Sequence, residues 1–319
     1  MESLKAFGHG IYAVDSGYTG PDVAAIHLIE EAGRAALVDT GNNESLQHVL
    51  EALAVTGLSA EAVDYVLLTH IHLDHAGGAG SFMRAFPNAR LVVHPRGARH
   101  MVEPSRLFAG VSAVYGPERA VELYGELLPV PVERIIEATD GLELSLAGRV
   151  IRVFDTPGHA RHHVCYFDTR SRSFFTGDTF GFSYRTLDVG GRPSIFPTTS
   201  PVQFEPDAMH ASIARMEAEQ PRAMYLTHYA QVTEVTRLAA DLHRLIDAHV
   251  MIAERYVALP AGAERARRIA ADLWGLVGDE AVRNGWTVGE SEWRRILAVD
   301  VQLNAQGLDV WLDSQARTA

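Results

Sequence analysis

The sequence predicts a layered α/β (α+β) fold with sheets in the middle and helices outside, followed by a helical C-terminal extension. This prediction rests on two β-rich parts of the chain, each of which also contains helical segments. Sheets packed between helices bury the apolar faces of both kinds of element. From about residue 232 onward the apolar spacing is almost entirely helical. We therefore expect one layered domain over residues 1–232 and a packed helical extension over residues 233–319.

Composition and charge narrow the class of protein. The chain has 319 residues, of which 47% are hydrophobic, and a formal net charge of -12. A strongly acidic chain gives no electrostatic support to nucleic-acid binding. The single cysteine, Cys165, excludes an internal disulfide and a cysteine-rich zinc site. We also expect no signal peptide, no membrane segment and a cytoplasmic location.

Short β-rich runs dominate the first part of the chain. Strands are expected over residues 10–16, 23–30, 34–41, 63–70 and 89–95. Helical spacing begins at residue 42, where Asn42 or Asn43 is a possible N-cap. Another helix begins near residue 76, and residues 96–130 read as helical pieces broken by glycine and proline. This interruption of the β pattern could form a lid over a site, a dimer contact or a surface hairpin.

The second β-rich block has the same character. Strands are expected over residues 142–158, 162–169, 172–178 and 223–228, with a helix over 206–220. All the tryptophans lie in the C-terminal part, which implies a genuine core or interface there and not a loose tail. They are Trp274, Trp286, Trp293 and Trp311.

Four groups of potential metal ligands each follow an apolar, strand-like run. One run precedes THIHLDHAGG, which holds three histidines and an aspartate, and Gly77 and Gly78 there allow the backbone to turn closely. The other three runs each precede one histidine or aspartate. Strand ends in a layered fold can converge on one edge, where loops carry functional side chains. The seven candidates are His70, His72, Asp74, His75, His159, Asp178 and His228.

Seven ligands exceed the number that one tetrahedral zinc ion requires. They suit two divalent first-row ions a few ångströms apart, with zinc favoured and iron or manganese accepting the same donors. Two such ions would share a water, make it hydroxide near neutral pH and polarise a carbonyl or phosphoryl oxygen. One ion would take His70, His72 and His159, the other Asp74, His75 and His228, and Asp178 could bridge them.

THIHLDHAGG resembles the HxHxDH signature of the metallo-β-lactamase superfamily. The resemblance extends to DTPGHARHHVCYFD, FFTGDTF and YLTHY in the family's order, and it covers roughly residues 8–230. It implies a four-layer αββα sandwich with the metal ions at one edge of the two sheets, so that residues 1–232 form the catalytic domain. It also implies that Asp39, in ALVDTG, and His163 support metal ligands from behind. His162 receives no role.

The stretch TPGHARHHVCYF is similar to that of glyoxalase II, a thioester hydrolase, and the same layout occurs in N-acyl-homoserine lactone lactonases. The resemblance implies a dinuclear hydrolase of a small ester, thioester or lactone, in which a metal-bridging hydroxide attacks the carbonyl. Asp74 would hold this nucleophile and pass its proton to the leaving group. The segment after Asp178 offers Tyr184 and Arg185 but no lysine, which speaks against glutathione as the leaving group.

Two other chemistries use related scaffolds. One alternative is an iron-dependent redox enzyme resembling sulfur or persulfide dioxygenases, which would consume oxygen. The other is a phosphodiesterase, against which the acidic charge argues. A non-enzymatic descendant that binds a partner is disfavoured because the ligand set is intact.

Substrate contacts are expected in the loop after Asp178. Phe180, Phe182 and Phe196 could form an apolar wall, or pack against the sheet. Tyr184 could donate a hydrogen bond to the developing oxyanion and so act in catalysis. Arg185 could pair with a substrate carboxylate, and Tyr229, beside His228, is a comparable candidate. The expected partner is a small molecule, and a homodimer is possible.

Overall fold

The computed structural model describes residues 4–200 and 202–316, which divide into two compact units. The first unit holds the chain up to Asp155 together with His162–Gly177 and Gln220–Thr233. The second unit holds Thr156–Arg161, Asp178–Glu219 and the chain from Glu234 onward. The chain passes from the first unit to the second between Thr233 and Glu234, next to the boundary that the sequence analysis places at residue 232. The second unit also includes two segments that the sequence assigns to the layered domain.

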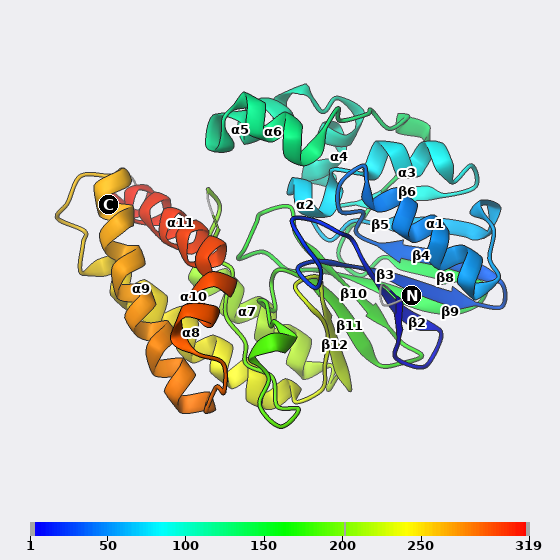
Figure 1. Ribbon diagram of the computed structural model, residues 1–319. Helices are drawn as coiled ribbons and strands as arrows, with labels where there is room; N and C mark the ends of the chain where they lie inside the picture. Colours follow the sequence, from blue (N-terminus) through cyan, green and yellow to red (C-terminus); the bar gives the residue numbers. More distant parts are fainter. Residues whose placement is uncertain (1–3, 201, 317–319) are drawn as a thin grey trace. The chain divides into compact units, whose positions relative to one another are not determined.

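The first unit contains a mixed sheet whose strands follow one another in chain order (Figure 1). The pairs from β1 to β4 are antiparallel, and the pairs from β4 to β7 are parallel. This first sheet consists of β1 (Leu4–Ala6), β2 (Ile11–Asp15), β3 (Ala25–Glu31), β4 (Arg34–Val38), β5 (Val63–Leu67), β6 (Arg90–Val93) and β7 (Ile135–Glu137).

A second sheet completes the β structure of this unit. Its strand order is β13-β12-β11-β10-β9-β8, and within this sheet, as far as the structure describes it, only the β11–β12 pair is parallel. Three-residue strands β1, β7 and β13 were not expected from the sequence, because so short a run shows no period. The second sheet consists of β8 (Glu143–Leu146), β9 (Arg149–Asp155), β10 (Val164–Asp168), β11 (Ser173–Gly177), β12 (Ala223–Leu226) and β13 (Ala230–Val232).

Apolar side chains from both sheets form one core cluster. Leu67 and Val92 of the first sheet belong to it together with Val153 and Tyr166 of the second, and all four are fully buried. The Tyr166 hydroxyl donates to the Leu68 carbonyl oxygen over 2.7 Å. This bond satisfies the polar end of a buried ring, as a dry core requires. The two sheets are therefore packed face to face.

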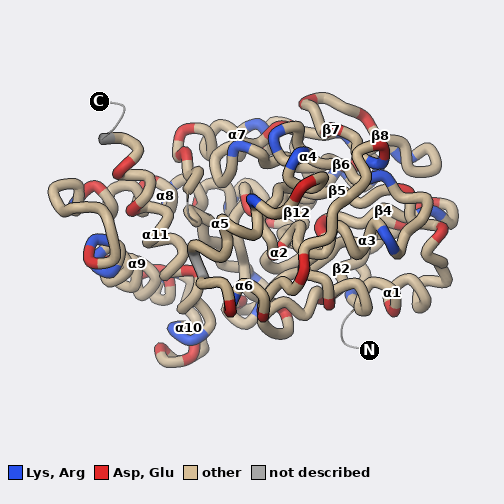
Figure 2. The backbone as a smooth tube through the Cα atoms, turned by 90° about the horizontal axis from the view of Figure 1, so that it is seen from above, with Lys and Arg blue, Asp and Glu red and all other residues tan. Residues whose placement is uncertain are grey.

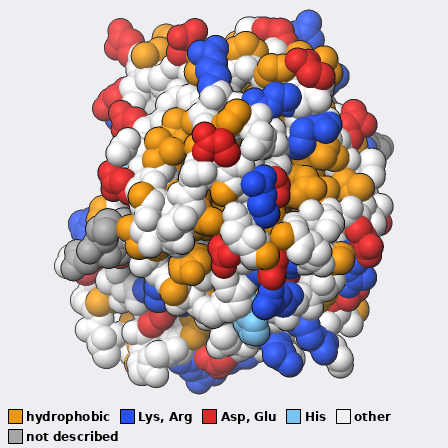
Figure 3. Space-filling model, turned by 90° about the vertical axis from the view of Figure 1, so that its right-hand side faces the viewer, with side chains coloured by type: hydrophobic (Ala, Val, Ile, Leu, Met, Phe, Trp, Pro, Cys, Tyr) orange, Lys and Arg blue, Asp and Glu red, His pale blue; other side chains and the backbone are white. Residues whose placement is uncertain are grey.

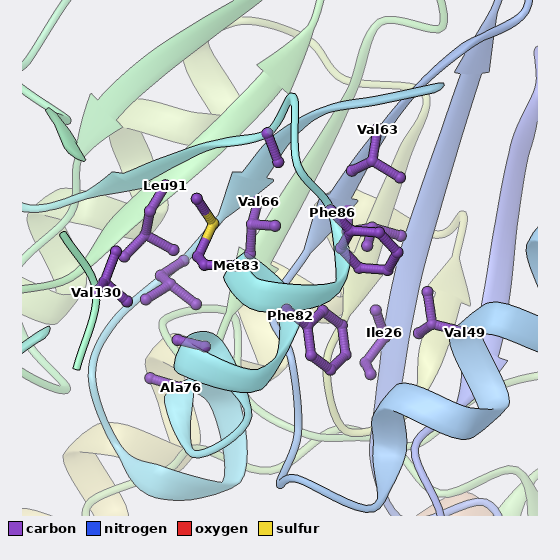
Figure 4. Close-up of a cluster of buried hydrophobic side chains, with 14 of the residues drawn as sticks. Ile26, Val49, Val63, Val66, Ala76, Phe82, Met83, Phe86, Leu91 and Val130 are labelled. Atoms are coloured by element: carbon purple, nitrogen blue, oxygen red, sulfur yellow. The ribbon is translucent and has the colours of Figure 1, made fainter. Parts of the chain in front are cut away.

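Helices cover the other face of the first sheet. Phe82 of helix α3 (Ala79–Ala85) and Phe86, which directly follows this helix, point toward the strands, near Ile26, Val63 and Val66 (Figure 4). Burial of each such ring contributes a few kcal/mol, by about 25 cal/mol per Å² of apolar surface. The helices of this unit are α1 (Ser45–Thr56), α2 (Leu73–Ala76), α3 (Ala79–Ala85), α4 (Pro95–Val102), α5 (Ser105–Tyr115) and α6 (Pro117–Tyr124), with 3₁₀ turns at Ala60–Ala62 and Val132–Arg134.

The start of α1 differs from the expectation. The N-cap is Glu44, and its side chain makes no capping hydrogen bond. Asn42 instead accepts from the backbone N–H groups of Glu44 and Ser45 at 3.1 and 3.2 Å. Asn43 donates to the Tyr124 carbonyl oxygen over 3.0 Å. The prediction of Asn42 or Asn43 as N-cap was therefore wrong by two residues or one, and the side chains of both asparagines instead hold this loop through hydrogen bonds to Leu123 and Tyr124.

The second unit is largely helical, as expected for the C-terminal part. Trp293 and Trp311 are buried there, and Trp274 and Trp286 are half-buried. Trp293 packs between the other two rings of its cluster, with centroids 6.0 Å from Trp274 and 6.1 Å from Trp286. The unit contains α7 (Pro206–Ala218), α8 (Val235–Glu254), α9 (Ala263–Asn284), α10 (Glu290–Ile296) and α11 (Ala298–Ala316), with a 3₁₀ turn at Arg185–Leu187.

Charged residues of both signs are spread along the backbone in Figure 2. The face drawn in Figure 3 likewise carries acidic and basic side chains interspersed with apolar ones. Among the described residues, no helix combines the length and the apolar composition that a membrane span requires.

Candidate metal centre

Several strands of the first unit end beside ligand-bearing segments. Strands β4 and β5 are parallel neighbours in the first sheet, and they lead into Asp39 and His70. Strands β11 and β12 are parallel neighbours in the second sheet, and they lead to Gly177 and His228. Neighbouring parallel strands carry their carboxyl ends to the same edge of a sheet. The strand-then-ligand pattern of the sequence therefore has a direct structural cause.

A one-turn helix, α2, organises the main histidine segment. His72 is its N-cap, while Asp74 and His75 lie within its four residues. Thr40 donates to the His75 carbonyl oxygen from both its N–H and its hydroxyl, at 2.7 and 2.8 Å. A Cβ atom at Gly78 would lie 2.5 Å from the Asn42 carbonyl oxygen. Glycine is needed here because the loop after β4 approaches α2 so closely.

Asp39 is the buried anchor of this segment. The side chain of Asp39 is 1% exposed and its backbone φ is 63°. Its carboxylate accepts hydrogen bonds from the Thr69 N–H and hydroxyl, from the Thr227 hydroxyl and from His75 Nδ1 at 2.8–3.0 Å. A buried carboxylate is tolerated when its lone pairs are satisfied in this way. Asp39 thus links the ends of β4, β5 and β12 and orients one imidazole.

The tautomers of two histidines follow from their partners. Because a carboxylate or carbonyl oxygen only accepts, His75 Nδ1 donates to Asp39 and His228 Nδ1 donates to the Val23 carbonyl oxygen, each over 2.8 Å. The neutral rings then keep their lone pairs at Nε2. These Nε2 atoms lie 3.6 and 3.4 Å from the same carboxylate oxygen of Asp74.

This spacing matches that of ligands on one metal ion. Two atoms bound about 2.0–2.1 Å from a tetrahedral ion are separated by about 3.3–3.4 Å. One ligand atom each from Asp74, His75 and His228 lies within 4.8 Å of the other two. Nitrogen and carboxylate donors without thiolate suit zinc, iron or manganese. The donor set of this cluster therefore fits a divalent first-row ion.

His70 and His72 form a second pair of facing nitrogens. The Thr69 hydroxyl hydrogen is directed to Asp39, so Thr69 Oγ1 accepts from His70 Nδ1 over 3.2 Å. His70 Nε2 then faces His72 Nδ1 at 2.9 Å. His70 also packs against His75, with ring centroids 4.0 Å apart. If the distance between these two nitrogens increased slightly, both could bind one metal ion.

Two further histidines border this cluster. His163 is fully buried and stacks on His70, with centroids 5.0 Å apart. A Cβ atom at Gly177 would lie 2.6 Å from His163 Nε2 and from Thr69 Oγ1. His162 lies 5.7 Å from His72 by ring centroids, and its Nδ1 has no hydrogen-bond partner among the described residues. Burial, followed by the neighbouring His72, lowers the pKa of His162 to about 3.

His159 and Asp178 belong to the second unit and are close to each other there. His159 Nε2 lies 3.5 Å from an Asp178 carboxylate oxygen, and both side chains are buried. His159 Nδ1 donates to the Thr198 carbonyl oxygen over 3.3 Å, which again leaves the lone pair of a neutral ring at Nε2. The geometry of this pair repeats that of the cluster in the first unit.

The expected substrate residues lie in varied surroundings. Phe180, Phe182 and Phe196 are at most 4% exposed, and the rings of Phe182 and Phe196 stack 5.7 Å apart. The Tyr184 hydroxyl donates to the Asp300 carboxylate at 3.1 Å. Arg185 donates to the Ser183 carbonyl oxygen, and Tyr229 is 6% exposed. Roles of these six residues in substrate binding or catalysis stay predictions.

Sequence reasoning missed the threonines around Asp39. Thr69 and Thr227 each donate a hydroxyl hydrogen to that carboxylate. Each directly precedes a predicted ligand, and the repeated Thr-His pair at 69–70 and 227–228 was the available signal.

Comparison with known proteins bears on family and fold. The model of the metallo-beta-lactamase superfamily matches residues 19–229. Hydroxyacylglutathione hydrolase of Aeromonas hydrophila is 31% identical over 193 residues, which are 60% of this chain and 56% of that protein. Atrochrysone carboxyl ACP thioesterase of Aspergillus fumigatus is 29% identical over 156 residues, which are 48% of this chain and 38% of that protein. The chain thus matches about half the length, or less, of these curated relatives.

A solved structure extends the comparison to nearly the whole chain. A metallo-beta-lactamase family protein of Thermus thermophilus has a TM-score of 0.65 and 22% identity, and the match covers 98% of this chain and 96% of that one. At this identity the likeness shows the fold alone. The αββα fold class expected from the sequence is thereby confirmed.

Proposed function

The chain belongs to the metallo-beta-lactamase superfamily, and from this premise we propose that it is a dinuclear metal-dependent hydrolase of a small ester, thioester or lactone. One observation carries the proposal. His75 and His228 are each held by a hydrogen bond at Nδ1, and both direct Nε2 toward one oxygen of Asp74 at ligand-like distances. Such bonds behind a ligand fix its tautomer and orientation.

We take the seven ligands to be those of the sequence analysis, with Asp178 bridging two ions. The covalent chain supports their convergence. Asp178 directly follows Gly177, which lies against Thr69 and His163, and consecutive Cα atoms are about 3.8 Å apart. His159 lies in the six-residue segment Thr156–Arg161, and the residues that flank this segment, Asp155 and His162, belong to the first unit. Both residues are therefore only a few residues along the chain from the unit that holds the histidine cluster.

Bound zinc, or iron or manganese on the same donors, would activate a water molecule and polarise the scissile carbonyl. Asp74 supplies the general acid–base function in this proposal. Its side chain is 24% exposed, whereas that of His75 is fully buried. A carboxylate held between two imidazoles and open on one side can accept a proton from the attacking water. It can then deliver that proton to the departing sulfur or oxygen.

Thioesters are the first bond class to test. The two curated relatives are named as an acyl carrier protein thioesterase and as a hydroxyacylglutathione hydrolase. Thiolate is also a better leaving group than alkoxide, so the demands on Asp74 as an acid are smallest for this class. Tyr184 keeps its proposed oxyanion role only if its hydrogen bond to Asp300 is exchanged for one to substrate.

The proposal is tested by metal analysis and a substrate panel. Protein stripped with a chelator is reloaded with zinc, manganese or iron and assayed on chromogenic thioesters, esters, lactones and a phosphodiester. An oxygen electrode with a persulfide substrate tests the redox alternative. We expect metal-dependent turnover of a thioester, ester or lactone without oxygen uptake. Turnover of only the phosphodiester would contradict the proposal and indicate a phosphodiesterase. Oxygen uptake with the persulfide would contradict it in favour of the redox enzyme.

Variants connect the activity to this site. Asp74→Asn is expected to lower kcat by about 100-fold or more, since acid–base groups typically contribute that much. His72→Ala removes a predicted metal ligand and is expected to abolish most of the turnover. His9→Asn is the matched control, because His9 is exposed and its positive φ of 53° is tolerated by asparagine. Full activity in the first two variants would exclude the site.

A further inference from the structure

Asn304 of α11 forms hydrogen bonds with the residues on both sides of Thr198. Its Oδ1 accepts from the Thr199 N–H at 2.8 Å, and its Nδ2 donates to the Pro197 carbonyl oxygen at 2.9 Å. Its backbone oxygen accepts from the Thr199 hydroxyl at 3.0 Å. Asn304 is 5% exposed and Thr199 is fully buried. Both polar groups of the Asn304 amide therefore form hydrogen bonds with the backbone on either side of Thr198.

A glycine in α11 allows this helix to lie close to residues 197–199. A Cβ atom at Gly307 would overlap the Thr199 carbonyl oxygen. Gly307 lies one helical turn after Asn304, on the same face of α11. The helix can therefore lie against residues 197–199 only with glycine at this position. This contact joins positions more than 100 residues apart within the second unit.

Thr198, held in this way, contacts both predicted metal ligands of the second unit. Its carbonyl oxygen accepts from His159 Nδ1 at 3.3 Å, and its hydroxyl donates to the Asp178 carbonyl oxygen at 2.8 Å. The first bond selects the tautomer that leaves the His159 lone pair at Nε2. The second bond holds the backbone from which the Asp178 carboxylate projects.

We propose that Asn304 is a positioning residue, which orients His159 and Asp178 through the backbone of Thr198. This inference rests on the proposed function, because it assigns the C-terminal helices a part in ordering that metal site. Partners behind a metal ligand typically change metal affinity by about 10–100-fold when they are removed. Asn304 acts one step further back, so its effect passes through the Thr198 carbonyl and hydroxyl groups.

The test begins with protein free of metal, so that it does not depend on activity. Nitrogen-15 NMR of histidine-labelled protein reports which ring nitrogen of His159 carries hydrogen. The wild type is expected to hold His159 with hydrogen at Nδ1, whereas Asn304→Leu, which has a similar volume, is expected to show averaged tautomers. A His159 signal unchanged in Asn304→Leu would overturn the inference.

Metal affinity provides the second measurement. Competition with a chromophoric chelator should show binding weakened by about 10-fold or more in Asn304→Leu. Asn284→Leu is the matched control, since Asn284 is half-buried in α9 and bonds only Glu280 among the described residues. Asn304→Asp keeps the acceptor for the Thr199 N–H but loses the donor to Pro197, so an intermediate affinity is expected. It also serves as the second variant if Asn304→Leu does not fold.

The outcomes separate the inference from the function on which it rests. If wild-type protein binds metal and hydrolyses a substrate but Asn304→Leu and Asn304→Asp match it in tautomer and affinity, only the positioning role is wrong. If wild-type protein binds no metal, the proposed function fails, whatever the NMR spectra show. Weakened binding in Asn304→Leu but not in Asn284→Leu supports both.

Discussion

His75 donates its Nδ1 hydrogen to a carboxylate oxygen of Asp39 2.8 Å away, and both side chains are buried. The same carboxylate also accepts from Thr69 and Thr227. It thereby ties the ends of three strands to the imidazole that faces Asp74. We therefore expect the stability of the fold and the order of the predicted metal ligands to be coupled at this one group.

Replacement of Asp39 by asparagine tests that coupling. The amide keeps one acceptor but presents two donors to groups that are themselves donors. We expect metal affinity to fall by about 10–100-fold and the free energy of unfolding to fall by about 1–3 kcal/mol. Chelator competition and urea denaturation measure the two effects. Asp64→Asn, at a partly exposed ion pair with Arg34, should change neither appreciably; unchanged metal affinity in Asp39→Asn would refute the coupling.

The close approach at Gly78 predicts a steric effect. An alanine Cβ there would lie 2.5 Å from the Asn42 carbonyl oxygen, so α2 or the loop after β4 must shift. We expect Gly78→Ala to lower the free energy of unfolding by about 1–3 kcal/mol and to weaken metal binding. Gly275→Ala in α9 meets no atom within 4 Å and should stabilise the protein by up to about 1 kcal/mol. Equal stability of the two variants in urea titrations would contradict this account.

Arg149 and Asp168 form a fully buried ion pair between β9 and β10, with a 2.5 Å contact. Burial alone would raise the pKa of Asp168, but hydrogen bonds from Arg149 and Ser171 hold that pKa below its usual value. Arg149 also donates to the His9 carbonyl oxygen over 2.6 Å, which connects this pair to the turn before β2.

Removal of one partner should therefore be costly. Arg149→Met leaves a buried carboxylate without its cation, and we expect a loss of about 3–5 kcal/mol. The double variant Arg149→Met/Asp168→Leu should recover much of this loss, since no charge then remains buried. Urea denaturation of both variants measures the difference, and a double variant no more stable than Arg149→Met would speak against the ion pair as the cause.

His27 predicts a dependence of stability on pH. It lies in the core with its ring 5.4 Å from Phe175 and 5.5 Å from Tyr225, and burial lowers its pKa from 6.5 to about 3. The unfolded chain binds a proton at this histidine below about pH 6.5, whereas the folded chain stays neutral down to about pH 3. Its contribution is thus present above the unfolded pKa and is lost as pH falls between these values.

At about 1.4 kcal/mol per pKa unit, the lowered pKa corresponds to a loss of about 2 kcal/mol at pH 5 and more below it. Denaturation of metal-free protein between pH 4 and about pH 7.5 measures this slope. His27→Leu should have a shallower slope and serves as its own control near pH 7.5, where the wild-type ring is neutral in both states. Parallel slopes for the two proteins would show that His27 is not the acid-sensitive group.

The elements that the sequence predicts best are those with a strong local signal. Strands β2 to β5 and the segment from His70 to His75 belong to this class, because apolar runs and ligand spacing are local properties. Asn42 misled the N-cap prediction because its loop is held by contacts with residues far along the chain. Asn304 and Arg149 gave no signal at all, since their partners lie 105–107 and 19 residues away. Tertiary partners of this kind cannot be read from spacing.

The most direct measurement of the central claim is the number of ions bound per chain. Equilibrium dialysis followed by elemental analysis is applied to the wild type, to His228→Ala and to the control His9→Asn. The account predicts two divalent ions in the wild type and the control, and a lower number or much weaker binding at one ion in His228→Ala. Wild-type protein without tightly bound metal, or His228→Ala with the same two ions at the same affinity, would contradict it.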